Sequence, residues 1–299
     1  MTVSPSDPMR HGRDRPNRVT GTFVRAGGVR WHLLRSGSGP TILLLHGSAS
    51  SAHQWNRVAP LLTSDFSLVI PDLPGHGDTS PLPRHGPALQ ALGRALAEVL
   101  EQEGIRPMLA AGHSAGAALA LHLAGYHLAD LRAVLAVTPA LGGREEYLPP
   151  FLGEGIARAV RGRLQARVAA GLVRRFPIVE ALLRSTGSRI SPGDAEHYRE
   201  LLADPSRMAG VLEFFSRWDA AGVTAEAARL PIRLHWLLAE DDRWTPPART
   251  LRTLRAHGAD RGPLRRLAVL PDRGHLLPEE DPAAIAEALR ELALLTGTQ

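Results

Sequence analysis

Short apolar runs alternate with longer amphipathic stretches along most of the chain. Six runs have the length of buried strands, and they lie at 41–45, 67–71, 107–112, 131–137, 233–239 and 264–270. Helical patterns lie between or after them, at 53–62, 87–103, 114–126 and 281–294. Strands that alternate with helices in this way predict crossover connections and a mostly parallel sheet. Before the first run, the segment FVRAGGVRWHLLR has the pattern of a β-hairpin.

The alternation stops between about residues 141 and 229. This stretch predicts four helices and no strand, with the helices at 154–176, 177–185, 193–203 and 206–221. An all-helical insertion between two strands is typical of a cap over the carboxyl edge of the sheet. We therefore expect an α/β fold with an eight-stranded, mostly parallel sheet flanked by helices. Its parts would be a polar tail at 1–20, a core at 21–140 and 230–299, and a helical cap at 141–229.

Composition narrows the function classes. The 299 residues are 44% hydrophobic and 22% charged, as in an ordinary globular protein. The net charge is +5, every basic residue is Arg, and no basic stripe with interleaved aromatics suggests nucleic acid as a partner. Zero Cys excludes disulfides and thiolate chemistry. Because the first twenty residues lack an apolar signal region and no long apolar run follows, we expect a cytoplasmic protein, with peripheral membrane contact as an alternative.

The stretch LAAGHSAGAA at 109–118 holds a Ser flanked by two glycines directly after an apolar run. This spacing predicts a nucleophile elbow, a strained strand-to-helix turn that exposes Ser114 above the sheet. Gly112 and Gly116 would let neighbouring backbone approach closely, with His113 and Ala115 on either side of the Ser. A structural Gly-rich turn is the alternative, so the pattern needs partners elsewhere in the chain.

Those partners follow later strands. Asp242 comes shortly after the run at 233–239, and His275 comes shortly after the run at 264–270. Strand ends of a parallel sheet meet at one edge, and the chain order Ser, Asp, His is that of the α/β-hydrolase arrangement. After the strand at 41–45 comes His46-Gly47-Ser48, where the Ser48 amide can form an oxyanion hole with the Ala115 amide.

Two neighbouring acids compete with Asp242. Glu240 and Asp241 lie nearer the strand and have the positions of solvated or capping residues, so we assign the triad acid to Asp242. The 13 His residues show no ligand spacing of the H-E-x-x-H kind, and the proposed chemistry needs neither metal nor other cofactor.

The segments HGSASS, PDLPGHG, GHSAG, AEDDRWTPP and GHLLPEEDP resemble the α/β-hydrolase superfamily over almost the whole chain. Ser114 disfavours the relatives that use an elbow Asp, the dehalogenases and epoxide hydrolases. Softer matches, HGSASSAHQW, GHSAGAALAL and LRSTGSRISP among them, resemble the magnesium-chelatase accessory hydrolases of bacteriochlorophyll biosynthesis. That resemblance implies a role in magnesium-tetrapyrrole metabolism.

The predicted cap carries a strong local charge. Residues 151–190 contain eight Arg and two acids. Apolar residues recur every four positions, which fits one stripe on a helix; they are Ile156, Val160, Leu164, Val168 and Leu172. We expect this stripe to pack on the core with the Arg solvated. The alternatives are that Arg174 and Arg175 meet an anionic membrane or a largely apolar anionic ligand such as a tetrapyrrole.

Two hypotheses of different class follow. One is a serine hydrolase that cleaves an ester or related acyl bond of a small apolar or tetrapyrrole-like substrate. The other is a non-catalytic accessory protein that binds a pigment precursor or assists magnesium chelatase, since a fold alone does not determine function. A full Ser-His-Asp set favours the enzyme.

Overall fold

The computed structural model describes residues 20–83, 88–143 and 163–297. Within these ranges, eight strands form a single sheet in the order β1-β2-β4-β3-β5-β6-β7-β8. The strands are β1 (Thr20–Ala26), β2 (Val29–Ser36), β3 (Thr41–Leu45), β4 (Ser67–Pro71), β5 (Leu109–His113), β6 (Ala133–Val137), β7 (Arg233–Ala239) and β8 (Arg265–Leu270). The expected eight-stranded fold is confirmed.

Strands β3 to β8 pair with one another in parallel. Strands β1 and β2 form an antiparallel hairpin, and β2 also pairs antiparallel with β4. The parallel strands β3 to β7 are buried on both faces, whereas the edge strand β8 is only partly buried. In β3, Ile42 and Leu44 pack into the core on one side while Leu43 and Leu45 pack into the core on the other, as the alternation of a strand requires. The apolar runs therefore read as continuous because both faces are covered.

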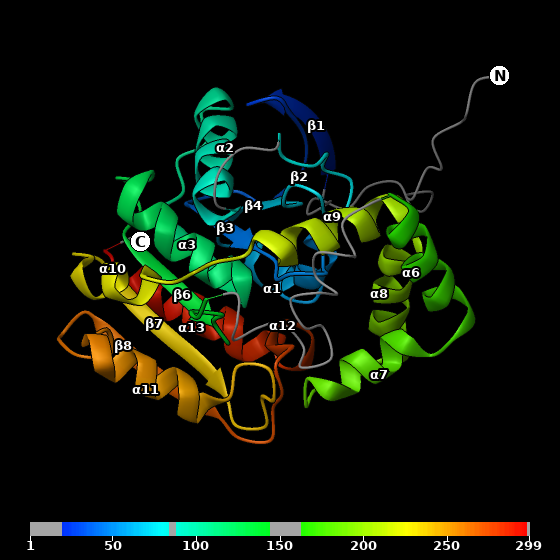
Figure 1. The fold of residues 1–299 in the computed structure, drawn as a ribbon. Helices are drawn as coiled ribbons and strands as arrows, with labels where there is room; N and C mark the ends of the chain where they lie inside the picture. The colour runs from blue at the N-terminus through cyan, green and yellow to red at the C-terminus, as the bar shows by residue number, and fades with distance from the viewer. Residues whose placement is uncertain (1–19, 84–87, 144–162, 298–299) are drawn as a thin grey trace.

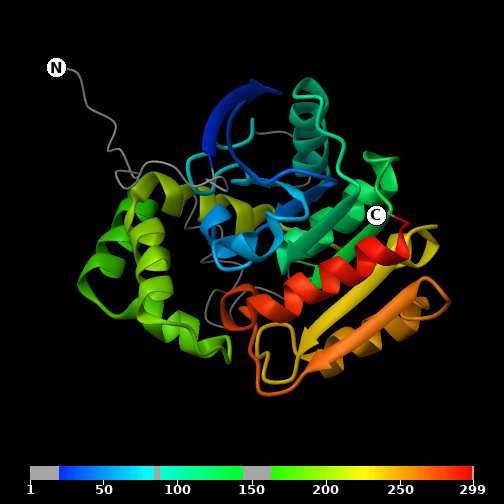
Figure 2. The same cartoon turned by 180° about the vertical axis from the view of Figure 1, so that it is seen from behind.

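Helices cover both faces of the sheet. The helices α2, α3, α10 (Val223–Arg229) and α11 share one apolar core, and η1, α1, α12 and α13 share the other. Figure 1 shows α2 and α3 on the near side of the sheet, and Figure 2 shows α13, in red, across the opposite side. Their bounds are the 3₁₀ turn η1 (Ala52–Trp55), α1 (Ala59–Leu62), α2 (Ala88–Gln102), α3 (Ala115–Tyr126), α11 (Pro247–His257), α12 (Leu277–Glu280) and α13 (Pro282–Leu295).

Five described helices lie between β6 and β7, and four of them form a separate group at one end of the sheet (Figure 1). A third apolar cluster joins these four to Ala49 and Leu276, which lie in loops that follow β3 and β8. The insertion thus packs against loops at the carboxyl edge of the sheet. Its described helices are α6 (Arg163–Arg175), α7 (Ile178–Ser185), α8 (Pro192–Ala203), α9 (Pro205–Arg217) and α10 (Val223–Arg229).

Three sequence expectations were wrong in detail. The segment 53–62 is not one helix, because Pro60 opens a new short helix, α1. The helix expected at 206–221 ends at Arg217, and Trp218 is extended. A further helix, α10, follows that the pattern did not suggest.

No helix of the described residues is long and apolar enough to cross a membrane.

The apolar stripe of the insertion also differs from expectation. Leu164, Val168 and Leu172 of α6 are exposed, whereas Ala166 and Ala170 are fully buried. Small residues let the helix approach its neighbours closely, so the packed side is the one with Ala and not the one with Leu. Ile156 and Val160 of the predicted stripe lie outside the described residues.

Candidate active site

Ser114 lies in a strained turn between β5 and α3. Its backbone has φ 53° and ψ −114°, a conformation that non-glycine residues rarely adopt. The Ser114 amide donates to the Val137 carbonyl at 2.9 Å, and the Ser114 carbonyl accepts from the amides of Ala117 and Ala140 at 3.1 Å each. These bonds hold the backbone of the strained residue in place.

The two glycines of the turn are required by close backbone contacts. A Cβ on Gly112 would lie 2.2 Å from the Gly116 carbonyl oxygen, and one on Gly116 would lie 2.4 Å from that of Leu45. Neither distance is possible for a real side chain. The glycines therefore allow α3 to start directly against β5 and the end of β3, as the elbow interpretation predicts.

Ser114, His275 and Asp242 are joined by hydrogen bonds. His275 Nε2 lies 3.0 Å from Ser114 Oγ, and His275 Nδ1 lies 2.8 Å from Asp242 Oδ2. All three side chains are buried. With the Asp242 carboxylate ionised, Nδ1 carries the proton and Nε2 accepts from the serine hydroxyl, which is the protonation needed to activate a nucleophile.

Asp242 is held on every side by donors. Its Oδ1 accepts from the amides of Trp244 and Thr245 at 2.8 Å each, and its Oδ2 accepts from the Thr245 hydroxyl at 2.6 Å. Burial alone would raise the pKa of this carboxyl, but the charge of His275 and these hydrogen bonds outweigh it and lower the pKa. Glu240 and Asp241 are exposed, so Asp242 is the acid of this trio that reaches His275.

Two side chains fix the backbone of His275. The His275 carbonyl accepts from His113 Nε2 at 2.8 Å and from the Thr138 hydroxyl at 3.0 Å. Burial lowers the pKa of His113 to about 3, so this ring is neutral and acts as a hydrogen-bond donor. From the sequence, His113 was expected only as part of the elbow, and Thr138 and Thr245 were missed. Thr245 lies three residues after Asp242 in the segment AEDDRWTPP. A polar side chain so close to the predicted acid was the signal that could have identified it.

The loop after β3 lies against Ser114. A Cβ on Gly47 would come within 2.7 Å of the His113 ring and 3.3 Å of the Ser114 side chain. His46 has a structural role here, because its Nδ1 donates to the Gly47 carbonyl at 2.7 Å and its Nε2 accepts from the Leu73 amide at 2.9 Å. Ser48 follows and lines the same pocket as Ser114. The Ala115 amide is the first of α3 and has no acceptor within its helix.

A pocket of about 430 Å³ lies over Ser114 and His275. Its lining from the insertion is mostly apolar, with Val179, Leu182, Leu183 and Leu202. Gln54, Tyr198, Thr186 and Trp244 supply the polar groups besides the catalytic candidates. Such a lining suits a small, largely apolar ligand with a few polar atoms.

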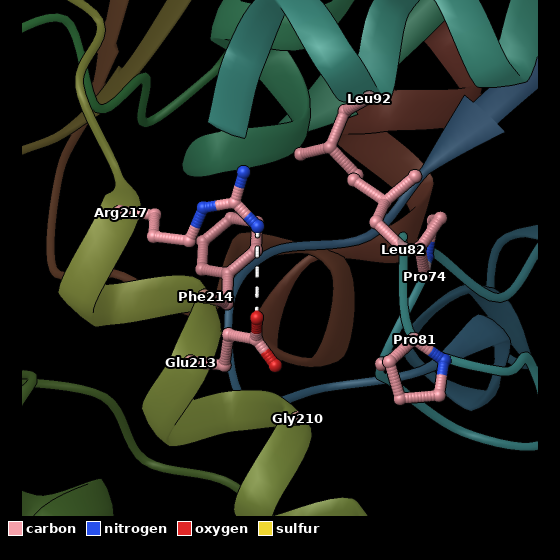
Figure 3. Close-up of a pocket in the computed structure, with 9 residues that line it drawn as sticks. Pro74, Pro81, Leu82, Leu92, Gly210, Glu213, Phe214 and Arg217 are labelled. Carbon is pink, nitrogen blue, oxygen red and sulfur yellow. Dashed lines mark ion pairs between the residues drawn. The ribbon is translucent and has the colours of Figure 1, made fainter. Parts of the chain in front are cut away.

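A second hollow of about 340 Å³ lies elsewhere, between α9 and the loop after β4 (Figure 3). Its lining includes Phe214, Leu82 and Leu92, and an ion pair of 3.5 Å joins Arg217 to Glu213 beside it. Its described lining includes none of the residues Ser114, His275 and Asp242. We therefore take the first pocket as the candidate active site.

A buried polar network ties the insertion to the core beside this pocket. Gln54 Nε2 donates to the Tyr198 hydroxyl at 3.1 Å and to Glu279 Oε1 at 3.3 Å, and Tyr198 donates to the same Glu279 oxygen. Gln54 Oε1 accepts from the Gly47 amide at 2.9 Å. The network thus connects α8 and α12 to the loop that carries Ser48. No sequence pattern predicted it, since its members are up to 225 positions apart.

Burial strongly affects the acid of this network. It raises the pKa of Glu279 to about 8, even though the bonds from Tyr198 and Gln54 oppose the change. Burial also raises the pKa of Tyr198 well above its usual value. At neutral pH, Glu279 is therefore a neutral carboxylic acid in the folded protein.

The segment Thr186–Ser188 clamps the two loops that carry Asp242 and His275. The Thr186 carbonyl accepts from the amides of Arg243 at 3.2 Å and His275 at 3.3 Å, and the Ser188 hydroxyl accepts from the Leu276 amide at 2.8 Å. This segment belongs to LRSTGSRISP, one of the motifs that resemble the accessory hydrolases. Its position gives the motif a physical function, which is to hold the catalytic candidates in register.

Gly187 is the tightest point of the clamp. Its φ is +84°, and a Cβ there would lie 2.0 Å from the Asp241 carbonyl oxygen. We expect Gly187→Ala to lower the free energy of unfolding by roughly 2–4 kcal/mol, because both the backbone conformation and the contact forbid a side chain. Urea denaturation measures the change. Gly193→Ala in α8 is the matched control, since a Cβ there meets nothing closer than 3.8 Å, and equal stability of the two variants would contradict the clamp.

The other predicted site residues lie apart from this centre. Arg174 and Arg175 are exposed at the end of α6 and are absent from the described lining of the pocket.

One described group, His32, Asp72 and Asp78, has atoms close enough to share a metal ion. Asp72 already accepts from His32 at 2.8 Å and from the Ala52 and Asp78 amides at 2.7 and 2.9 Å, which accounts for its carboxylate without an ion.

The chain is similar to known proteins over most of its length. The model of the alpha/beta hydrolase family matches residues 42–288. The magnesium-chelatase 30 kDa subunit of Rhodobacter capsulatus is 29% identical over 88% of this chain and 91% of its own length. A fluoroacetate dehalogenase from a Burkholderia species is 35% identical, but over only 31% of this chain and 32% of its own.

Solved structures agree on the fold. An alpha/beta hydrolase fold protein from Burkholderia ambifaria has a TM-score of 0.73 at 23% identity, over 92% of this chain and 99% of that one. A thermophilic esterase from Thermogutta terrifontis has a TM-score of 0.69 at 22% identity, over 93% and 100% of the two chains. At these identities the likeness extends to architecture alone.

Proposed function

Because the chain belongs to the alpha/beta hydrolase family, we propose that it is a serine hydrolase that cleaves an ester or related acyl bond. The observation that carries the proposal is the hydrogen-bonded chain Ser114–His275–Asp242, whose Ser114 and His275 line the pocket. Within the described residues, the part of 141–229 that follows β6 serves as the cap, and residues 21–140 with 230–299 serve as the core. The expected tail at 1–20 lies, except for Thr20, outside the described residues.

In the proposed mechanism, Ser114 Oγ attacks the substrate carbonyl carbon while His275 Nε2 takes the hydroxyl proton. The negative oxygen of the tetrahedral intermediate accepts from the amides of Ser48 and Ala115. The bond to the leaving alcohol then breaks, and His275 gives the alcohol its proton. Water, activated by His275, hydrolyses the acyl-enzyme in the same way, and Asp242 keeps the imidazole oriented throughout.

We also propose a metabolic pathway and a substrate class for this hydrolase. The relative named magnesium-chelatase 30 kDa subunit supports a role in magnesium-tetrapyrrole metabolism, in bacteriochlorophyll biosynthesis. The mostly apolar pocket supports a small apolar or tetrapyrrole-like ester. The protein would act in the cytoplasm without a bound cofactor, with magnesium chelatase or a membrane surface as its contact.

A second candidate is a non-catalytic accessory protein that binds a pigment precursor or assists magnesium chelatase. The name of the same relative, a subunit and not a hydrolase, favours this alternative. It would leave the Ser114–His275–Asp242 geometry without a purpose, since binding alone requires none of those hydrogen bonds.

Labelling with a small fluorophosphonate probe separates the two candidates. We expect wild-type protein and Ser206→Ala, which removes an exposed hydroxyl on α9, to be labelled, and Ser114→Ala to remain unlabelled. Labelling that survives in Ser114→Ala would overturn the assignment of the nucleophile. A folded wild-type protein that takes no label would favour the accessory role.

A further inference from the structure

Helix α6 buries its small residues and exposes its large ones. Ala166, Ala170 and Val173 pack into the apolar cluster of the insertion. On the outer side, large apolar residues form a continuous row that extends to the start of α7; they are Leu164 (69% exposed), Val168 (56%), Leu172 (44%), Phe176 (51%) and Ile178 (40%). The first four are spaced four positions apart, so successive side chains are neighbours on the surface.

Such a row is unusual for a surface in contact with water. Scattered exposed apolar residues are normal, but a contiguous apolar patch usually marks a binding surface. The row also lacks the acidic residues that commonly solubilise a helix, since α6 contains none. The row therefore requires an occupant of matching chemistry.

The charges beside the row indicate which occupant. Arg167, Arg174 and Arg175 are exposed, and none of them forms an ion pair with a residue in the described parts of the chain. Exposed apolar side chains bordered by guanidinium groups are typical of a helix that lies in the interface of an anionic bilayer. The apolar groups enter the acyl boundary while the Arg side chains contact lipid phosphates.

We propose that this α6 face, the five apolar residues with Arg167, Arg174 and Arg175, docks the protein on an anionic lipid membrane. The face leads to the pocket. Ile178 ends the apolar row, and the same helix, α7, lines the pocket over Ser114 with Val179, Leu182 and Leu183. An apolar substrate could thus pass from the bilayer to the pocket along α7, a step that rests on the proposed hydrolase function.

Sedimentation with vesicles tests the docking itself. We expect the wild-type protein to bind phosphatidylcholine vesicles that contain phosphatidylglycerol, more weakly at high salt, and to bind pure phosphatidylcholine poorly. Arg174→Gln with Arg175→Gln should weaken binding about tenfold or more, and so should Leu164→Gln with Leu172→Gln.

Matched controls come from exposed residues on other helices. Arg249→Gln with Arg252→Gln on α11, and Leu294→Gln with Leu295→Gln on α13, remove the same kinds of side chain and should leave vesicle binding unchanged. Wild-type protein that ignores anionic vesicles, or control variants that weaken binding as much as the α6 variants, would overturn the proposal. So would a stable dimer that the α6 variants dissociate, because it would assign the face to a second copy.

The failures of the two proposals can be told apart. Fluorophosphonate labelling reports on Ser114 and vesicle sedimentation reports on α6, and neither measurement needs the other. Labelled protein that does not bind vesicles would remove the membrane role and keep the hydrolase. Protein that binds vesicles but takes no label would do the reverse.

Discussion

Asp242→Asn is expected to lower kcat for a short-chain p-nitrophenyl ester by about 10³- to 10⁴-fold. The amide can keep accepting from Trp244 and Thr245 through its oxygen, so the local structure should survive. Its NH₂ group, however, would then face His275 Nδ1 and donate to it. The ring would carry its proton on Nε2 instead, where it could no longer accept the proton of Ser114.

The neighbouring acid supplies the control. Asp241 is exposed, and its backbone amide donates to the Arg273 carbonyl at 2.8 Å. Its carboxylate is not part of the hydrogen-bonded chain of Ser114, His275 and Asp242. Asp241→Asn should leave kcat within about twofold of wild type, as most exposed substitutions do. A larger loss of turnover in Asp241→Asn than in Asp242→Asn would reverse the assignment.

The predicted part of the site follows from one property of parallel sheets. Because strand ends meet at a common edge, Ser114, Asp242 and His275 could be brought together from their positions after apolar runs alone. The elbow glycines were equally readable, since the G-x-S-x-G spacing implies the close approach that Gly112 and Gly116 allow. These inferences needed no knowledge of contacts between distant residues.

The supporting residues needed such knowledge. Thr138 donates to the carbonyl of His275 across 137 positions, and Tyr198 bonds to Glu279 across 81. No local pattern selects one Thr or Tyr for these contacts, because each depends on how the insertion packs on the core. The α6 face shows the same limit. A four-residue spacing of Leu and Val predicts a helix with an apolar side, but it does not say whether that side meets the core or another partner.

Glu279→Gln is expected to make the protein more stable against unfolding than the wild type, by a margin that grows as the pH rises. In the unfolded chain the carboxyl titrates near its ordinary pKa of 4.5, whereas burial raises the pKa to about 8 in the folded protein. Between these values the folded state holds a proton that unfolding releases, so the stability of the wild type falls as pH increases and levels off above pH 8. Glutamine cannot lose a proton, and the variant lacks this decline.

The difference in stability between the two proteins should grow from near zero at pH 4.5 to roughly 4 kcal/mol at pH 8, since a tenfold change in proton affinity corresponds to about 1.4 kcal/mol. Guanidinium denaturation at pH 5, 7 and 8.5 measures it. Glutamine keeps the oxygen that accepts from Gln54 and Tyr198, and its NH₂ replaces an Oε2 atom that has no partner in the described structure. Glu287→Gln, on the exposed side of α13, should show no pH-dependent gain. A constant difference for Glu279→Gln across this range would mean that the carboxyl is ionised in the folded protein, and that the network between α8 and α12 holds a charge instead of a proton.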